Sequence, residues 1–421
     1  MMDKITEMFF APARWQYAID KGYRKGISNA DLYRLCKPEF RAAMYNAVCG
    51  GKYVISPPHT ARIPKDTPGE FRTVYVNEPV DRVFLSIAND LLFDLTPDMR
   101  HPSCRSYLRG TGCGDVVRDV SRIAASASAD VIGWKSDLSK YFDSVPIQYV
   151  DVAFDRVECK FGHSAIIDVL RKYYHCDLYF DEHNNICRAY QSLKQGCSVA
   201  SWLADVLLYH IDERLSALRG YYVRYSDDML FIGEDHEAAM EILKDELARM
   251  QMRLNPRKVE LLYRDRWFKF LGFSIKGSMV SLSATRIKSF QHEIESRTTR
   301  NRKVSQSSAI SSVVQYLYKG DGEHSWATQV MPVINVRKDI DTLNQYVMDA
   351  LRAVQTGRGK IGGLGFVADG KDGCIARGTG KNVCTNRERT AAVVERYRSL
   401  GCMWKAMRTS RAAYRTLLST I

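Results

Sequence analysis

A pair of adjacent aspartates between two apolar runs is the feature that most constrains the fold of this chain. Residues 221–233 read YYVRYSDDMLFIG, so apolar segments flank a polar tip at Ser226, Asp227 and Asp228. Two short apolar runs around a short polar tip are typical of a β-hairpin. An isolated aspartate pair is usually a solvated turn, because aspartate favours turns. Here the burial of both flanking runs would hold the two carboxylates at a fixed place in a sheet.

A third carboxylate ends another apolar run earlier in the chain. Residues 131–137 read VIGWKSD, the pattern of a buried strand that ends at Asp137. Asp137 could instead be the N-cap of a following helix, since aspartate is common at that position. If the strand and the hairpin share a sheet, three carboxylates meet. Phosphoryl transfer to a 3′-hydroxyl by two Mg²⁺ ions requires hard oxygen ligands of this kind, and substrate phosphates complete the coordination.

Apolar periodicity along the rest of the chain alternates between the patterns of strands and helices, which predicts an α+β fold. Strand patterns cover 62–81, interrupted by a turn at Thr67-Pro68-Gly69, together with 267–275 and 279–282. Helix patterns cover 82–95, 198–214, 236–253, 336–354 and 387–418, and short helices are expected within 1–54. Glycine-rich loops are expected at 110–114 and 357–380.

The charge of the chain indicates a polyanionic partner. The net charge of +13 is uneven, because nine Lys or Arg residues stand against two glutamates between Lys381 and Ile421, a net +7. Basic helices interleaved with aromatic residues suit contact with an RNA backbone and stacking on its bases. A solvated bundle of basic helices has the same composition and is the alternative.

The sequence contains no sign of export or of a membrane span. No apolar run reaches the roughly 18 residues that a span needs, and the N-terminus does not resemble a signal peptide. We therefore expect a cytoplasmic protein with no membrane partner. The eleven cysteines include no CxxC pair, which argues against a disulfide framework and against a zinc ribbon.

Seven short strings follow one another in a fixed order along residues 55–285. Three of them are the run from Asp137 to Asp143, Leu193-Lys194-Gln195-Gly196-Cys197-Ser198 with Ser201, and Tyr225-Ser226-Asp227-Asp228. A fourth string consists of Ile63-Pro64-Lys65, Gly69, Arg72 and Asp81-Arg82, and a fifth consists of Ser106-Tyr107, Gly110 and Gly112. The last two are the run from Leu254 to Lys258 and Phe270-Leu271-Gly272-Phe273. In this order and spacing they resemble the motifs of reverse transcriptases. One string matches the YxDD box, and another departs from the LPQGxxxS pattern because Lys194 stands at the usual proline.

The resemblance implies a two-metal centre. Asp137, Asp227 and Asp228 would be the catalytic metal ligands, with most of the coordination carried by Asp137 and Asp227. The Leu138 carbonyl would add a backbone ligand. The expected cofactors are two Mg²⁺ ions, with Mn²⁺ as an alternative. Lys258 would protonate the leaving pyrophosphate as a general acid, or else it faces solvent.

The resemblance also implies a nucleotide-binding site. Lys65 and Arg72 would grip the triphosphate of the incoming nucleotide, since long cationic side chains suit a polyanion. Gln195 and Gly196 would line the nucleotide pocket, although Gly196 could simply form the turn before a helix. Phe142 stands where the family places a steric gate, whose ring would exclude a ribose 2′-hydroxyl and so favour dNTPs over rNTPs.

The architecture that the resemblance implies is a right-hand polymerase. We expect an N-terminal helical extension at 1–54, fingers and a palm with an antiparallel sheet at 55–285, a helical thumb at 286–355 and a basic helical RNA-binding region at 356–421. The implied activity is RNA-directed DNA synthesis, with an RNA template, dNTPs and a cDNA product as partners. No obligate protein partner is evident.

Among reverse transcriptases the chain most resembles bacterial enzymes of antiphage defence, in particular the type 2 system that pairs the enzyme with a non-coding RNA. The length of the chain, the lack of recognisable endonuclease or RNase H patterns, Lys194 and the basic C-terminal region motivate this comparison. We therefore expect a dedicated structured non-coding RNA as template. Two alternatives stay open: a retron-type enzyme, which makes a 2′-linked RNA–DNA product, and a group II intron-like maturase that chiefly binds RNA.

Overall fold

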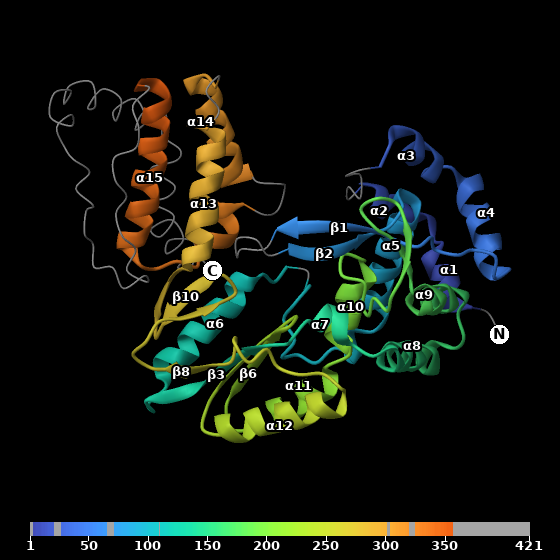
Figure 1. Cartoon of the computed structure of the whole chain (residues 1–421), viewed down its shortest axis with the longest axis horizontal. Helices are drawn as coiled ribbons and strands as arrows, with labels where there is room; N and C mark the ends of the chain where they lie inside the picture. Colours follow the sequence, from blue (N-terminus) through green and yellow to red (C-terminus); the bar gives the residue numbers. More distant parts are fainter. Residues whose placement is uncertain are drawn as a thin grey trace. The chain divides into compact units, whose positions relative to one another are not determined.

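The chain divides into two units, and both combine helices with β-sheets (Figure 1). Strand pairing is antiparallel in the hairpins, whereas β1 and β4 of the first unit pair parallel. The computed structural model describes residues 3–20, 27–64, 71–108, 110–300, 304–319 and 325–356. One unit comprises residues 1–107 and 133–261, and the other comprises 108–132 together with the described residues from 262 onward. The predicted α+β class is confirmed. The loop expected at 357–380, the basic helix at 387–418 and nearly all of the C-terminal region at 356–421 lie outside the described residues.

A four-stranded sheet is the centre of the first unit. Its strand order is β6-β7-β3-β8, with bounds Tyr221–Tyr225, Asp228–Ile232, Val131–Asp137 and Glu260–Tyr263. Strand β7 pairs antiparallel with both β6 and β3, so the predicted hairpin and the predicted strand share one sheet. The alternative of an N-cap is wrong for Asp137, because it ends β3 and the next helix, α7 (Tyr141–Ser144), has Lys140 at its N-cap.

The helix predicted at 198–214 is in fact two helices, α10 (Val199–Val206) and α11 (Tyr209–Ser216). A continuous helix would bond the carbonyls of Ala204 and Asp205 to the N–H groups four residues further on. Instead these carbonyls accept hydrogen bonds from the Arg224 guanidinium at 3.0 and 2.8 Å. The apolar periodicity runs through the break, so the sequence pattern alone did not reveal it.

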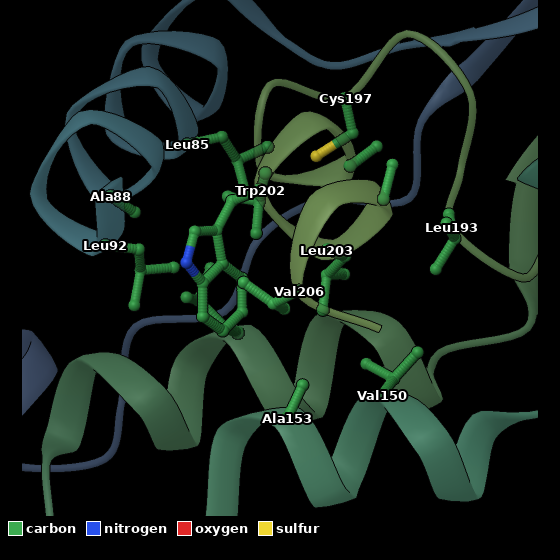
Figure 2. Close-up of a cluster of buried hydrophobic side chains, with 14 of the residues drawn as sticks. Leu85, Ala88, Leu92, Val150, Ala153, Leu193, Cys197, Trp202, Leu203 and Val206 are labelled. Carbon is green, nitrogen blue, oxygen red and sulfur yellow. The ribbon is translucent and has the colours of Figure 1, made fainter. Parts of the chain in front are cut away.

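Helix α10 lies in the largest apolar core of the first unit. Trp202 is fully buried, and its indole N–H donates to the Thr96 hydroxyl at 2.9 Å. Figure 2 shows the indole between Leu92 of α5 (Pro79–Leu95) and Ala153 of α8 (Ile147–Phe161). This packing fixes α10, which follows directly on the loop that contains Gln195. Helix α5 confirms the helix predicted at 82–95.

A second sheet of the first unit has the order β2-β1-β4-β5. Strands β1 (His59–Pro64) and β2 (Phe71–Val76) pair antiparallel and confirm the two extended runs predicted within 62–81. The predicted turn at Thr67-Pro68-Gly69 lies outside the described residues, as does Lys65. The short hairpin of β4 (Leu178–Phe180) and β5 (Ile186–Arg188) was not predicted.

Helices complete the first unit. The short helices predicted within 1–54 are confirmed, with bounds Lys4–Phe9 (α1), Pro12–Asp20 (α2), Asn29–Leu35 (α3) and Pro38–Cys49 (α4). A 3₁₀ turn at Pro97–Met99 and helix α9 (Ala165–His175) were not predicted, whereas α12 (His236–Arg249) confirms the helix expected at 236–253. Helix α11 packs against β6 and against α12, and α12 packs against β7 (Figure 1).

The described part of the second unit combines a small sheet with four α-helices. Its strands are β9 (Phe268–Phe270), β10 (Phe273–Lys276) and β11 (Met279–Leu282), and α6 (Cys113–Ser126) contacts β10. The helices α13 (Ala284–Arg297), α14 (Gln306–Val314) and α15 (Arg337–Thr356) lie against one another (Figure 1), with π-helical turns at Gln315–Lys319 and Trp326–Val330. Helix α15 confirms the helix expected at 336–354.

Two predictions for the second unit need correction. The single strand that periodicity predicts at 267–275 is a hairpin, because the backbone turns at Leu271 (φ 48°) and Gly272 (φ 79°). This agrees with the resemblance of Phe270-Leu271-Gly272-Phe273 to the primer-grip hairpin of reverse transcriptases. The loop expected at 110–114 is shorter, since α6 already begins at Cys113. None of the described helices combines the length and the apolar character that crossing a membrane requires. The cysteines of the described ranges are free thiols.

Candidate active site at the turn between β6 and β7

The structure brings three predicted metal ligands together at the end of the central sheet. Asp137 lies directly opposite Asp228 in the pairing of β3 with β7, and Tyr225 lies opposite Asp228 in the hairpin. The Cβ atoms of such facing residues are about 4.5–5.5 Å apart. Asp227 lies in the two-residue turn that precedes Asp228. Three carboxylates thus come from two neighbouring strands and the turn between β6 and β7.

The three carboxylates disfavour one another's charge. Burial, and then the charges of Asp227 and Asp137, raise the pKa of Asp228 to about 7. Burial and the charge of Asp137 likewise raise the pKa of Asp227, against smaller opposing effects that include the charges of Lys258 and Arg72. A buried group of repelling carboxylates is a strong site for divalent cations, which prefer hard oxygen ligands. This donor set therefore fits the expected Mg²⁺ or Mn²⁺ ions.

The position of Leu138 suits a backbone ligand. Leu138 forms an isolated antiparallel bridge with Leu254. The residues on either side make the two hydrogen bonds of this bridge, both at 2.9 Å: Asn255 N–H donates to the Asp137 carbonyl, and Ser139 N–H donates to the Arg253 carbonyl. In this type of antiparallel pair the central residue directs its own N–H and C=O away from the partner. The Leu138 carbonyl is therefore not used by this bridge.

Lys258 contacts the carboxylates directly. Its ammonium donates to Asp137 Oδ2 at 2.5 Å, while 57% of its side chain stays exposed. Partial burial acts to lower the pKa of Lys258, but the hydrogen bond to Asp137 and the charges of all three aspartates outweigh it and raise the pKa. Lys258 thus donates a hydrogen bond at the site while much of its side chain faces solvent. Its expected role as a general acid stays a prediction.

The expected nucleotide-pocket residues Phe142, Gln195 and Gly196 are connected through the backbone. Phe142 of α7 is half-buried, and its carbonyl accepts a hydrogen bond from Leu193 N–H at 3.0 Å. The Gln195 carbonyl accepts from Tyr75 N–H of β2 at 2.7 Å. These bonds join the 193–197 loop to α7 on one side and to β2 on the other.

Only glycine fits at position 196. Gly196 has φ +108°, and a Cβ there would lie 2.8 Å from the Tyr75 carbonyl oxygen. The close approach of the loop to β2 therefore explains this glycine, three residues before α10 begins. Arg72 is exposed on β2 opposite Ile63, and its charge interacts favourably with Asp227. Lys65, the other expected triphosphate contact, lies outside the described residues.

Lys194, the departure from the expected proline, has a structural role. Its backbone φ is +52°, whereas proline fixes φ near −65°, so this loop conformation excludes proline. The side chain is 1% exposed, and its amine donates to the Cys176 carbonyl at 2.7 Å and to Gln191 Oε1 at 2.5 Å. The amine also lies 5.0 Å from the centre of the Tyr173 ring. Lys194 thus fastens the loop to the end of α9.

Several residues around the turn were not assigned a role from the sequence. Arg224 of β6 and Asp212 of α11 form a fully buried ion pair behind the turn, and Asp205 of α10 is also fully buried. Ser106 contacts the turn itself. A charged residue within the apolar run YYVRY was a usable signal for Arg224, since a buried arginine requires a partner.

Comparisons with known proteins give one family and several distant structures. A family model described as reverse transcriptase (RNA-dependent DNA polymerase) matches residues 63–275, about half of the 421 residues. No curated protein matches the sequence.

Apo telomerase from Candida tropicalis aligns with a TM-score of 0.45 at 12% identity, over 72% of this chain and 59% of that chain. Telomerase from Candida albicans, in complex with a TWJ fragment of telomeric RNA, aligns with a TM-score of 0.43 at 13% identity, over 72% and 55%. The chain spans less than two thirds of these telomerase chains.

Replacement of Lys194 should change the pH dependence of stability. Burial lowers the pKa of Lys194 to about 8, below its ordinary value of 10.5. Between these two values the unfolded chain binds the proton more tightly than the folded chain, so folding becomes more favourable as pH rises. Relative to Lys194→Met, the wild-type protein should gain roughly 2 kcal/mol between about pH 7.5 and about pH 9.5 in urea unfolding. A stability difference that stays constant with pH would contradict a buried, deprotonating amine.

Proposed function

Because this chain belongs to the reverse transcriptase family, we propose that it is an RNA-directed DNA polymerase with its reaction centre at Asp137, Asp227 and Asp228. The match over residues 63–275 carries the family assignment. One observation carries the site: the strand register sets Asp137 opposite Asp228, beside Asp227 in the turn. These side chains form an all-oxygen donor set of the kind that holds catalytic Mg²⁺ or Mn²⁺.

Each residue of the centre has a part in nucleotide addition. Two bound Mg²⁺ ions, or Mn²⁺ in their place, would activate the 3′-hydroxyl and stabilise the leaving pyrophosphate. Asp137 and Asp227 would hold the ions, the Leu138 carbonyl would add a neutral ligand, and Asp228 would contribute less directly. Lys258, charged and bonded to Asp137, gives a proton to the pyrophosphate as it leaves.

The surrounding elements bind the incoming dNTP. Arg72 and Lys65 hold the triphosphate, and Gln195 with Gly196 lines the pocket. The backbone links from the 193–197 loop to Phe142 and to β2 support a common pocket for these residues. The ring of Phe142 lies against Tyr141, with ring centres 5.5 Å apart, which limits its movement and suits a gate against the 2′-hydroxyl.

The template in this proposal is a dedicated structured non-coding RNA, and the biological role is antiphage defence in the bacterial cytoplasm. The net +7 between Lys381 and Ile421 supports an RNA partner, because Lys and Arg neutralise phosphates. Residues 356–421 would bind this RNA, and the helices α13, α14 and α15 suit a helical thumb at 286–355 that follows the fingers and palm at 55–285. The extension at 1–54 supports the fingers.

Removal of the turn carboxylates should abolish polymerisation without unfolding the protein. Asp227→Ala/Asp228→Ala should reduce dNTP incorporation on a primed RNA template by at least roughly 1,000-fold, because several kcal/mol of metal-dependent stabilisation is lost. The melting temperature should not fall, since the substitution removes repelling buried carboxylates. Asp245→Asn on the exposed face of α12 is the matched control and should retain activity.

Two companion variants refine the same assay. Phe142→Ala should lower the preference for dNTPs over rNTPs, and Lys258→Ala should lower kcat with little change in the KM for dNTP. An active Asp227→Ala/Asp228→Ala protein would refute the assignment of the centre. An unchanged dNTP/rNTP ratio in Phe142→Ala would refute the gate alone.

The nucleic acids that co-purify with the full chain test the proposed template. A discrete, structured RNA and DNA complementary to part of it are expected when both are sequenced from cells that express the protein from its own locus. The absence of a discrete RNA would contradict the proposal. A 2′-linked RNA–DNA product would identify a retron-type enzyme instead, and enrichment of intron RNA would identify a maturase.

A further inference from the structure

Ser226, the first residue of the two-residue turn, holds an unusual backbone conformation. Its φ is +59°, in the left-handed region that residues other than glycine rarely adopt. Both of its peptide groups are bonded: the N–H donates to Ser106 Oγ at 3.0 Å, and the carbonyl accepts from Arg224 Nη1 at 3.1 Å. That carbonyl belongs to the peptide unit that leads into Asp227. The two bonds therefore set the direction in which Asp227 leaves the turn.

The orientation of Ser106 is itself fixed by a buried carboxylate. The segment before Ser106 runs beside β6, through a bridge between Cys104 and Arg224. The Ser106 hydroxyl donates to Asp205 Oδ1 at 2.6 Å, and both residues are fully buried. With its proton directed to Asp205, the hydroxyl oxygen turns a lone pair towards the Ser226 N–H. Among the described residues, Asp205 Oδ2 has no hydrogen-bond partner, so the bond to Ser106 at Oδ1 is what orients this carboxylate towards the turn.

Arg224 is equally fixed. Its Nε and Nη2 donate to the two oxygens of Asp212 at 2.7 and 2.6 Å, and both side chains are fully buried. The Tyr222 hydroxyl donates to the same carboxylate at 2.9 Å. The guanidinium therefore cannot turn away from the Ser226 carbonyl without breaking a buried ion pair, which would leave a buried charge without its partner.

We propose that Ser106, Asp205 and Arg224 are positioning residues, which hold Ser226 in its left-handed conformation and thereby direct the Asp227 carboxylate at the metal ions. Asp205 acts through Ser106, and Asp212 acts through Arg224. This inference rests on the proposed function, because it takes Asp227 as a metal ligand. A merely structural role for the same residues would change stability but not metal affinity.

Ser106→Ala in the full chain tests the proposal most cleanly. The substitution removes the acceptor for the Ser226 N–H while it leaves every proposed metal ligand in place. The affinity for Mn²⁺ alone, measured by titration with electron paramagnetic resonance, should weaken by roughly 10- to 100-fold, as for other residues that orient metal ligands. The kcat for dNTP incorporation should fall by the same order, with the KM for dNTP changed by less than about threefold.

Ser164→Ala is the matched control. Ser164 is also a fully buried serine of the first unit, and its hydroxyl accepts from Ile166 N–H at 3.3 Å as the N-cap of α9. Its loss should lower the melting temperature and leave Mn²⁺ affinity and kcat unchanged. Equal effects of Ser106→Ala and Ser164→Ala on Mn²⁺ affinity would overturn the proposal.

Asp205 supplies a second arm in case Ser106→Ala folds poorly. Asp205→Asn keeps an acceptor for the Ser106 hydroxyl, so its Mn²⁺ affinity should stay within a few-fold of wild type. Asp205→Ala should weaken Mn²⁺ affinity as much as Ser106→Ala does. The double variant Ser106→Ala/Asp205→Ala should bind Mn²⁺ no more weakly than either single variant, because both changes break the same chain of bonds. Wild-type Mn²⁺ affinity in Asp205→Ala would overturn the inference. A wild-type protein that neither binds Mn²⁺ nor incorporates dNTPs would instead refute the proposed function.

Discussion

The buried ion pair between Arg224 and Asp212 is the interaction on which the rest of the site depends. Burial of a guanidinium and a carboxylate is favourable only when nearly every donor and acceptor is satisfied. The guanidinium has five N–H donors, and the structure gives it five hydrogen bonds, to the Asp212 carboxylate and to the carbonyls of Ala204, Asp205 and Ser226. One side chain therefore ends helix α10, joins β6 to α11 and fixes the turn that contains Asp227.

The turn is thus a place where stability and chemistry oppose each other. A left-handed serine costs free energy. Burial and the neighbouring carboxylates also raise the pKa values of Asp227 and Asp228, that of Asp228 to about 7. Neither feature stabilises the folded chain. Both are held by the packing of α10 around Trp202 and by the hydrogen bonds behind the turn. Such an arrangement is expected where a protein must present charge to a bound cation and a polyphosphate.

Much of this site could be predicted from sequence because its determinants are local. The apolar runs on both sides of Asp227 and before Asp137 are enough to predict the strands β6, β7 and β3. The family match confirms the enzyme class that the ordered strings indicated. Asp137, Asp227 and Asp228 come together because β3 and the β6–β7 hairpin pair in one sheet, and the two strand patterns made this pairing a natural expectation. The assignment of catalytic and nucleotide-binding roles stays a prediction.

The features that could not be predicted depend on contacts between distant segments. Helix α10 ends because Arg224, further along the chain, binds its carbonyls, and no periodicity within 198–214 shows this. The sequence shows Lys194 as a departure from a motif. Its left-handed backbone and its bond to the Cys176 carbonyl, which depend on a distant segment, make it part of the loop's structure.

Anomalous diffraction from a Mn²⁺ complex with primed RNA template and a dNTP tests the central claim most directly. Two Mn²⁺ peaks about 3.5–4 Å apart are expected, with oxygens of both Asp137 and Asp227 as ligands. Mn²⁺ peaks elsewhere, or an intact bond from Lys258 to Asp137 with no metal beside it, would contradict the account of a two-metal polymerase centre.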